Sequence, residues 1–257
     1  MNETRLRIYN YIKNYIKDNG YAPTQREIQE ATGLKSLSSV NSHLHQLESG
    51  GYLAMSRGAR GITLTRSPEA KYSFFAKVFK MKHINRWALM RNTTQENVSQ
   101  HSMEVAMIAH ALAVIGNVYY GQEYDAYKVS TKALFHDISE VITGDMPTPV
   151  KYATEDLKQA YKVIERSALE RLLEDLPDEL QSTYKRIVEP DKYKLLIKAA
   201  DVISALIKCR EEIHSGNMEF NAAYNTTLEK LNQLQCKEAN KFIELFVGAF
   251  DKSLDEL

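Results

Sequence analysis

The first fifty residues carry apolar side chains at the spacing of amphipathic helices. Starting near the N-terminus, these side chains recur on one helical face at Ile8, Ile12, Tyr15 and Ile16. Gly20 follows them as a helix stop. The pattern therefore predicts a first helix that ends at this glycine.

Two further helices are predicted before residue 50. Thr24 can cap the second, because Glu27, three residues on, can reach back to the amide of the cap. This helix stops at Gly33, and Ser36 can then open a third helix. The glycine pair at 50–51 ends the third helix, which carries on one face Val40, Leu44 and Leu47.

A hairpin is predicted after the third helix, with strands at residues 52–55 and 62–64. The strands flank the polar run Ser-Arg-Gly-Ala-Arg-Gly, whose tip offers the two cations Arg57 and Arg60. Three helices followed by a hairpin is the order of a winged helix-turn-helix domain. In helix-turn-helix domains one helix enters the major groove of DNA.

A polar segment at residues 65–71, with a Ser-Pro break, separates this region from a long stretch of helical periodicity. We therefore divide the chain into domains 1–66 and 67–257. The second domain is predicted to be all-α, which makes the protein mainly α. Its expected helices cover approximately 72–83, 97–117, 125–142, 154–175, 177–188, 191–214, 218–234 and 236–252.

Composition excludes several classes of protein. The 257 residues are 44% hydrophobic and 26% charged, which excludes a disordered or collagen-like chain. No stretch approaches the roughly 20 consecutive apolar residues of a membrane span, and the start of the chain does not resemble a signal peptide. We expect a cytoplasmic protein with no membrane contact. Two cysteines, Cys209 and Cys236, cannot form a disulfide framework.

The net charge of zero conceals a difference between the two domains. Residues 1–66 carry nine Lys and Arg against five Asp and Glu, so the remainder of the chain is acidic by the same margin. This asymmetry suggests separate partners for the two domains, although a weak basic excess alone does not establish nucleic-acid binding.

The run GYAPTQREIQEATGLKSLSSVNSHLHQLESGGYL, followed by RGARGITL, resembles the DNA-binding domain of the SOS repressor LexA. The resemblance implies that the third helix lies in the major groove of double-stranded DNA and the hairpin along its backbone. An alternative is a winged helix kept as a protein-interaction module. The resemblance implies that bases and phosphates are contacted by Lys35, Ser36, Ser38, Ser39, Asn41, Ser42, Arg57 and Arg60.

Candidate metal ligands occur in the second domain in a selective order. His101 lies near the start of a predicted helix, His136 and Asp137 are adjacent after an apolar run, and Asp201 follows an Ala-Ala pair on an apolar helix face. A carboxylate in such surroundings needs a partner or a metal. Imidazole and carboxylate together suit a divalent transition metal better than calcium. This order resembles the HD phosphohydrolase superfamily, which implies an all-α HD domain with one divalent transition metal ion, cobalt or manganese.

Neighbouring motifs sharpen the resemblance. The segments INRWALMRNTTQENVSQHSMEVAMIAHALA, HDISEVITGDMPTPVKY and IKAADVISALIKCREEI closely resemble the bacterial HD-domain 5′-deoxynucleotidases, which release phosphate from deoxynucleoside 5′-monophosphates. The resemblance implies that Arg86 binds the phosphate and acts in catalysis, and that Trp87 packs where a ribose 2′-hydroxyl would protrude. It further implies that Asp145 accepts from the sugar 3′-hydroxyl. The implied nucleotide loop is Thr148, Pro149, Val150 and Lys151.

Glu140 matches the catalytic acid of that family. Its spacing points the same way, since it lies three residues beyond Asp137 and four beyond His136 and would face the metal on a continuing helix. Such a carboxylate can orient the attacking water or protonate the leaving alkoxide, and the sequence leaves both roles open.

Three functions fit these observations. The leading one is a metal-dependent phosphohydrolase of deoxynucleoside 5′-monophosphates whose DNA-binding domain makes it a nucleotide-linked transcriptional regulator. The second is a deoxynucleoside triphosphate triphosphohydrolase, and the third is a transcription factor whose HD domain only senses nucleotide. An intact Glu140 with a complete ligand set favours activity over sensing. The family resemblance also implies a homodimer formed through the HD domain.

Overall fold

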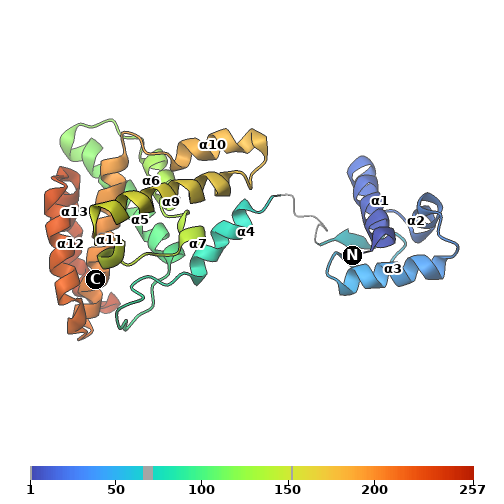
Figure 1. The fold of residues 1–257 in the computed structure, drawn as a ribbon, viewed down its shortest axis with the longest axis horizontal. Coiled ribbons are helices and arrows are strands. Elements are labelled where there is room, and N and C mark those ends of the chain that lie inside the picture. Colours follow the sequence, from blue (N-terminus) through green and yellow to red (C-terminus); the bar gives the residue numbers. More distant parts are fainter. Residues whose placement is uncertain (1, 66–71, 152) are drawn as a thin grey trace. The chain divides into compact units, whose positions relative to one another are not determined.

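The computed structural model describes residues 2–65, 72–151 and 153–257 (Figure 1). The chain forms two compact units, Met1–Lys71 and Tyr72–Leu257. Each unit has a hydrophobic core of its own. The domain boundary that the sequence predicts between residues 66 and 67 lies outside the described residues.

The first unit consists of three helices and an antiparallel two-stranded hairpin, in the predicted order of a winged helix-turn-helix. Leu53 pairs with Leu64 and Met55 with Ile62. The predicted first strand is one residue too long at its start. The elements are α1 (Glu3–Asn19), α2 (Gln25–Thr32), α3 (Leu37–Ser49), β1 (Leu53–Met55) and β2 (Ile62–Leu64).

Local capping sets the helix ends in this unit. Gly20 ends α1 in the left-handed conformation, with φ 79°, which favours glycine. Thr24 and Glu27 form the predicted capping box at the start of α2. Ser36 caps α3 by accepting a hydrogen bond from the Ser39 amide at 3.2 Å. These three predictions from the sequence are confirmed.

Apolar side chains from all three helices and both strands fill the core of the first unit. The predicted helical stripes supply most of it, and burial of these side chains stabilises the unit because it removes apolar surface from water. The fully buried members include Ile8, Ile12, Ile28, Val40, Leu44 and Leu47.

The second unit is helical, apart from one isolated bridge between Asn85 and Asn97 among its described residues. Its longest helices are α5 (Val98–Tyr120) and α11 (Lys194–His214). Its other helices are α4 (Phe74–Val78), η1 (Phe79–His83), α6 (Ala126–Leu134), α7 (Glu140–Thr143), α8 (Thr148–Lys151), α9 (Glu155–Leu173), α10 (Asp178–Val188), η2 (Met218–Phe220), α12 (Asn221–Gln233), α13 (Lys237–Phe246), η3 (Val247–Asp251) and η4 (Leu254–Glu256).

Helices α5 and α11 pack against each other through the main core of this unit. Helix α5 is long and apolar enough to cross a membrane by length and composition alone. Half of its most apolar window is buried, and residues such as Val105, Ala109 and Leu112 lie fully inside the core. A helix that is apolar on most of its faces is typical of the centre of a helical domain as well as of a membrane span.

One predicted helix is wrong. The sequence predicts a continuous helix over 125–142, but α6 ends at Leu134 and α7 begins at Glu140. Between them the backbone tightens into turns with hydrogen bonds to the third preceding residue, as from the His136 amide to the Ala133 carbonyl at 3.2 Å. Such bonds turn the chain by more than 100° per residue, so side-chain positions in this segment do not follow α-helical spacing.

Candidate active site and DNA-binding surface

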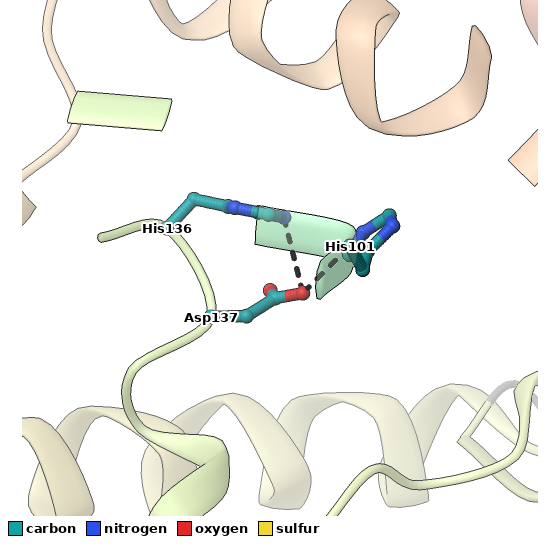
Figure 2. A group of neighbouring side chains, drawn as sticks. All are labelled: His101, His136 and Asp137. Carbon is teal, nitrogen blue, oxygen red and sulfur yellow. Dashed lines mark ion pairs between the residues drawn. The ribbon is translucent and has the colours of Figure 1, made fainter. Parts of the chain in front are cut away.

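Three predicted metal ligands meet at the end of α6. His101 lies in the first turn of α5, and His136 and Asp137 lie in the turns between α6 and α7. One nitrogen or oxygen from each side chain lies within 4.8 Å of the other two, and Figure 2 shows the two rings and the carboxylate pointing toward one common centre. The break in the predicted helix therefore creates this cluster instead of dispersing it.

Asp201 of α11 completes the predicted set. Its Oδ1 atom lies 3.2 Å from Nε2 of His101, and its Oδ2 atom accepts from the Lys198 ammonium at 2.7 Å. Burial raises the pKa of Asp201, but Lys198 and His101 outweigh burial and hold the pKa well below its usual range. All four predicted ligands thus come together, from three different parts of the second unit.

The tautomer of His136 suits a cation. Its Nδ1 atom lies 2.7 Å from the Ala133 carbonyl oxygen, and because a carbonyl only accepts, Nδ1 carries the proton. In the neutral ring, Nε2 then presents a lone pair. This atom is buried, makes no hydrogen bond within the described residues and lies 3.0 Å from Oδ2 of Asp137. Two acceptors at this distance call for a cation between or beside them, and a divalent transition metal fits nitrogen and carboxylate donors.

Charges in the cluster reinforce this fit. Burial lowers the pKa of His101, but its hydrogen bonds to Asp201 and Glu96 outweigh burial and raise the pKa to about 9. Burial raises the pKa of Asp137, whereas the positive charge that His136 carries when protonated, with no metal bound, outweighs burial and holds the pKa of Asp137 at about 2. The cluster therefore keeps two carboxylates ionised and attracts a proton to an imidazole, as expected of a cavity that favours positive charge.

Glu140 lies beside the cluster at the start of α7. Burial raises the pKa of its carboxyl group, and the charges of Asp137 and Asp145 raise it further, to about 9. Its Oε2 atom is buried and makes no hydrogen bond within the described residues. Without a bound metal, this environment favours the protonated carboxylic acid, a form that suits proton donation.

A cavity of about 460 Å³ opens next to the cluster. Its wall includes Asp201 and most of the predicted substrate residues: Arg86, Trp87, Asp145, Thr148 and Pro149. Val150 and Lys151 are not part of this wall; the Lys151 ammonium instead pairs with Glu165 at 2.7 Å. The predicted nucleotide loop is also a single helical turn, α8, so its successive side chains point in different directions.

Arg86 is buried between carboxylates. Its Nε atom lies 3.4 Å from Oε1 of Glu96, and one terminal nitrogen lies 3.8 Å from Oδ2 of Asp137. Burial lowers the pKa of Arg86, but Glu96 and Asp201 outweigh burial and raise it above its ordinary value. The guanidinium therefore stays charged, and it joins the cluster to the cavity.

Sequence reasoning missed several residues of this site. Lys198 of α11 and Lys230 of α12 line the cavity, and Glu96 contacts Arg86, Trp87 and His101. Lysines on helices are usually solvated, and nothing in their spacing marks these two. Glu96 stands in the polar run TTQEN, where its burial has no periodic signal.

Hydrogen bonds hold the loop that carries Arg86 and Trp87 against α11. The buried carboxylate of Glu212 accepts from the backbone amides of Thr93, at 2.9 and 3.1 Å, and of Thr94, at 3.1 Å. Lys208 donates to the Thr94 carbonyl at 2.6 Å and pairs with Glu212. Because both charges are buried and paired, the loop is held by interactions whose removal would leave a buried charge uncompensated.

Comparison with known proteins identifies the second unit. Residues 73–250 match the family model described as 5′-deoxynucleotidase YfbR-like. The chain belongs to this family. It is 44% identical over 188 residues to the 5′-deoxynucleotidase YfbR of an Escherichia coli O1:K1 strain, a match that covers 72% of this chain and 94% of that protein. The YfbR of Salmonella paratyphi B is likewise 44% identical over 189 residues. The second unit is therefore an HD-domain enzyme of the 5′-deoxynucleotidase family.

Solved structures confirm the predicted fold. An HD-domain phosphohydrolase from Listeria innocua superposes with a TM-score of 0.62 at 23% identity, covering 69% of this chain and 88% of that chain. A conserved hypothetical protein from Pyrococcus furiosus superposes with a TM-score of 0.54 at 24% identity, covering 68% and 98%. At these identities the similarity shows the HD-domain fold alone.

The unit that precedes this 5′-deoxynucleotidase domain matches the LexA DNA-binding domain over residues 2–61. Lys35 and Ser36, just before α3, and Ser38 and Ser42, within it, are exposed. Ser39 and Asn41 are half-buried, and the side-chain oxygen Oδ1 of Asn41 accepts from the side-chain amide of Gln25 at 3.3 Å. Arg57 is exposed at the hairpin tip.

Arg60 has a different environment from the one its sequence position suggests. Its guanidinium pairs with Glu27 of α2 and donates to the Ala22 carbonyl at 2.8 Å. It also lies over the ring of Tyr21, 4.4 Å from the centroid. Arg60 thus fastens the hairpin to the helices, and much of its charge is balanced within the unit.

Proposed function

We propose that the second unit hydrolyses deoxynucleoside 5′-monophosphates to deoxynucleosides and inorganic phosphate, using one divalent transition metal ion, with cobalt or manganese as the first choices. This proposal rests on one observation: the predicted metal ligands and a cavity lie next to each other. Asp201, beside the His101–His136–Asp137 cluster, lines a cavity large enough for a nucleotide, and Arg86 lies both in the same cavity wall and 3.8 Å from Asp137. Similarity to the YfbR 5′-deoxynucleotidases supports the same activity.

The ligand set proposed for the metal is His101, His136, Asp137 and Asp201. Atoms of His101, His136 and Asp137 converge, and Asp201 lies 3.2 Å from His101. In the neutral ring of His136, the buried Nε2 atom offers a lone pair to a cation. A bound divalent ion supplies Lewis acidity, which polarises a phosphoryl oxygen and lowers the pKa of water.

The side chains around this centre divide the remaining work. The planar guanidinium of Arg86 binds the phosphate through charged hydrogen bonds. Trp87 packs against the sugar, and Asp145 accepts from its 3′-hydroxyl. Burial and the charges of Asp137 and Asp145 favour the protonated form of Glu140, which can donate its proton to the 5′-oxygen as the phosphate–oxygen bond breaks. A charged alkoxide is a poor leaving group, so protonation at that atom lowers the barrier.

Deoxynucleoside triphosphates are the second candidate substrate. Lys198 and Lys230 line the same cavity. Burial lowers the pKa of Lys230, and the nearby charge of Lys198 lowers it further. Two nearby cations suit a longer phosphate chain. The assignment to monophosphates rests on the Arg86–Trp87 pair and on the resemblance to the YfbR enzymes.

We further propose that the first unit binds double-stranded DNA in the cytoplasm, and that the chain acts as a homodimer and couples nucleotide level to transcription. One face of α5 supports pairing of two second units. It exposes Met103, Met107, Val114 and Val118, the last with 70% of its side chain accessible. These positions follow one another on one side of the helix. An exposed apolar stripe of this kind is typical of a protein interface, and a dimer presents two helix-turn-helix units to a two-fold symmetric operator.

The decisive experiment is incubation of the full chain with each deoxynucleoside mono- and triphosphate in the presence of cobalt or manganese. Chromatography of the products distinguishes phosphate from triphosphate. Phosphate from monophosphates supports the proposal, and triphosphate from triphosphates would replace it with the second candidate. Nucleotide binding without any product would leave a sensor.

A further inference from the structure

Glu96 contacts three side chains of the proposed site at once. Its carboxylate accepts from the Trp87 indole nitrogen at 2.6 Å through Oε2. Its Oε1 atom lies 3.4 Å from Nε of Arg86 and 3.3 Å from Nδ1 of His101. Only 4% of the residue is exposed. A buried carboxylate is stable only when such donors surround it, so the three contacts and the charge of Glu96 depend on one another.

The backbone places Glu96 beside these residues. The Arg86 amide donates to the Glu96 carbonyl at 2.9 Å, next to the bridge between Asn85 and Asn97. The two segments therefore run antiparallel as a short ladder. Glu96 consequently approaches Arg86 and Trp87 from a fixed direction.

Trp87 adopts an unusual conformation that needs external support. Its φ is 57°, in the left-handed region that costs a bulky residue free energy. Two contacts stabilise the indole in this conformation: the bond to Glu96 and packing on the buried Phe220 ring, with centroids 5.3 Å apart. Of the two, only the bond to Glu96 is directional, so Glu96 determines how the ring is turned within the cavity wall.

We propose that Glu96 is a positioning residue that sets the preference for deoxyribose over ribose by holding the Trp87 indole against the sugar. This inference rests on the proposed function. Substrate selectivity then depends on a carboxylate that does not touch the substrate, because a ring free to turn would make room for a 2′-hydroxyl. The same carboxylate holds the Arg86 fork, so phosphate binding and sugar selection share one anchor.

The test is Glu96→Gln in the full chain. The glutamine amide can keep one acceptor toward Trp87 or toward Arg86 and His101, but its NH₂ group then meets a donor on the other side. We expect the ratio of kcat/KM for dAMP over AMP to fall about tenfold, the effect of losing one charged hydrogen bond. The matched control is Glu211→Gln, which removes the same charge from an exposed position on α11 and should leave the ratio unchanged.

A second readout does not depend on turnover. Trp87 is the only tryptophan in the chain, so fluorescence of the metal-free protein reports on this ring alone when it is excited at the long-wavelength edge, where tyrosine does not absorb. In Glu96→Gln we expect a shifted emission maximum and faster quenching by acrylamide, whereas Glu211→Gln should match the wild type. An unchanged spectrum together with an unchanged dAMP/AMP ratio would overturn the proposal.

Trp87→Phe tests the same bond from the other side and serves if Glu96→Gln does not fold. It removes the indole donor and should lower the dAMP/AMP ratio. Glu96→Gln should then lower the ratio no further in the Trp87→Phe background, since contacting residues that act through one bond are not additive. A full additional loss would refute positioning through Trp87. If the wild-type chain released no phosphate from any deoxynucleotide, the proposed function would fail, while the fluorescence comparison would still decide whether Glu96 holds the ring.

Discussion

The guanidinium of Arg60 pairs with the carboxylate of Glu27, 33 residues earlier in the chain, through two nitrogen–oxygen contacts of 3.2 Å. The same carboxylate accepts from the Thr24 amide in the capping box and from the Tyr15 hydroxyl at 2.8 Å. One side chain thus joins α1, the start of α2 and the hairpin. The hairpin of the DNA-binding unit is consequently held against the helices by the negative charge of Glu27.

This arrangement predicts a pH dependence of stability in the first unit. Hydrogen bonds from Thr24 and Tyr15 lower the pKa of Glu27 to about 2, from an ordinary value of 4.5. A depressed folded-state pKa contributes stability above the unfolded value and loses it as pH falls toward the folded one. The protection factors of the α2 amides in the full chain, which are exchange rates corrected for the intrinsic pH dependence, should therefore fall between about pH 5 and pH 2. Glu27→Gln should flatten this part of the profile and speed exchange at pH 7; an unchanged profile would contradict the assignment.

Asp137→Ala should abolish metal binding and hydrolysis together. Asp137 supplies a buried anionic ligand. Its removal should lower metal affinity by more than the roughly 10- to 100-fold that follows removal of a residue that only supports a ligand. Metal content by atomic emission and phosphate release measure the two effects on the same sample. A variant that kept both properties would exclude Asp137 from the ligand set.

Glu140→Gln should retain metal and nucleotide while turnover falls by about 10²- to 10⁴-fold, the range expected of a general acid or base. The neutral amide preserves size but cannot give up a proton. Equilibrium dialysis of metal and titration of nucleotide provide the binding measurements, and kcat provides the turnover. Loss of metal in this variant would make Glu140 a ligand.

Arg86→Lys should weaken nucleotide binding through the phosphate. A lysine keeps the charge but not the planar fork, so the Kd for dAMP should rise about tenfold while that for deoxyadenosine changes little. Calorimetry with both ligands separates the two effects. Equal weakening of both would place Arg86 outside the phosphate site.

DNA binding should depend on pairing of two chains. A single helix-turn-helix makes few base contacts, and a linked second copy raises affinity by about 10²- to 10⁴-fold. Gel-shift titration against a palindromic operator selected from random DNA should therefore show much weaker binding by the 1–66 fragment than by the full chain, with a strong salt dependence. Val118→Asp, on the exposed face of α5, should lower the affinity of the full chain toward that of the fragment. Equal affinity of fragment and full chain would refute the dimeric model.

The parts of the fold that depend on local chemistry could be predicted from the sequence. Gly20, Thr24 and Ser36 set helix ends through their own backbone or a side chain three residues away, so the pattern was sufficient. The segment 135–139 was not predictable in this way. Its apolar residues suit a helix, but its turns bring His136 and Asp137 beside His101 of α5, a contact between segments far apart in the sequence that local spacing does not encode.

The ligand cluster could be predicted because its residues have a distinctive order in the sequence. The residues that hold the site in place could not be predicted. Glu96 acquires its role from a contact with His101 and from a ladder with the segment around Arg86, and neither leaves a periodic signal. Arg60 shows the converse: its position at a wing suggested phosphate contact, but its partner lies on α2. Long-range pairing of charges is decided by tertiary structure, which composition and spacing do not encode.

Helix α11 fixes the distance between two parts of the proposed site in the second unit. It contributes Asp201 to the ligand cluster and, three turns and about 16 Å further along, Glu212 to the loop that bears Arg86 and Trp87. Inserting one residue between them would rotate one end by about 100° relative to the other and separate the metal centre from the nucleotide-binding loop. The spacing of these two carboxylates along α11 thus couples the position of the metal centre to that of the nucleotide-binding loop, independently of the residues on the exposed side of the helix.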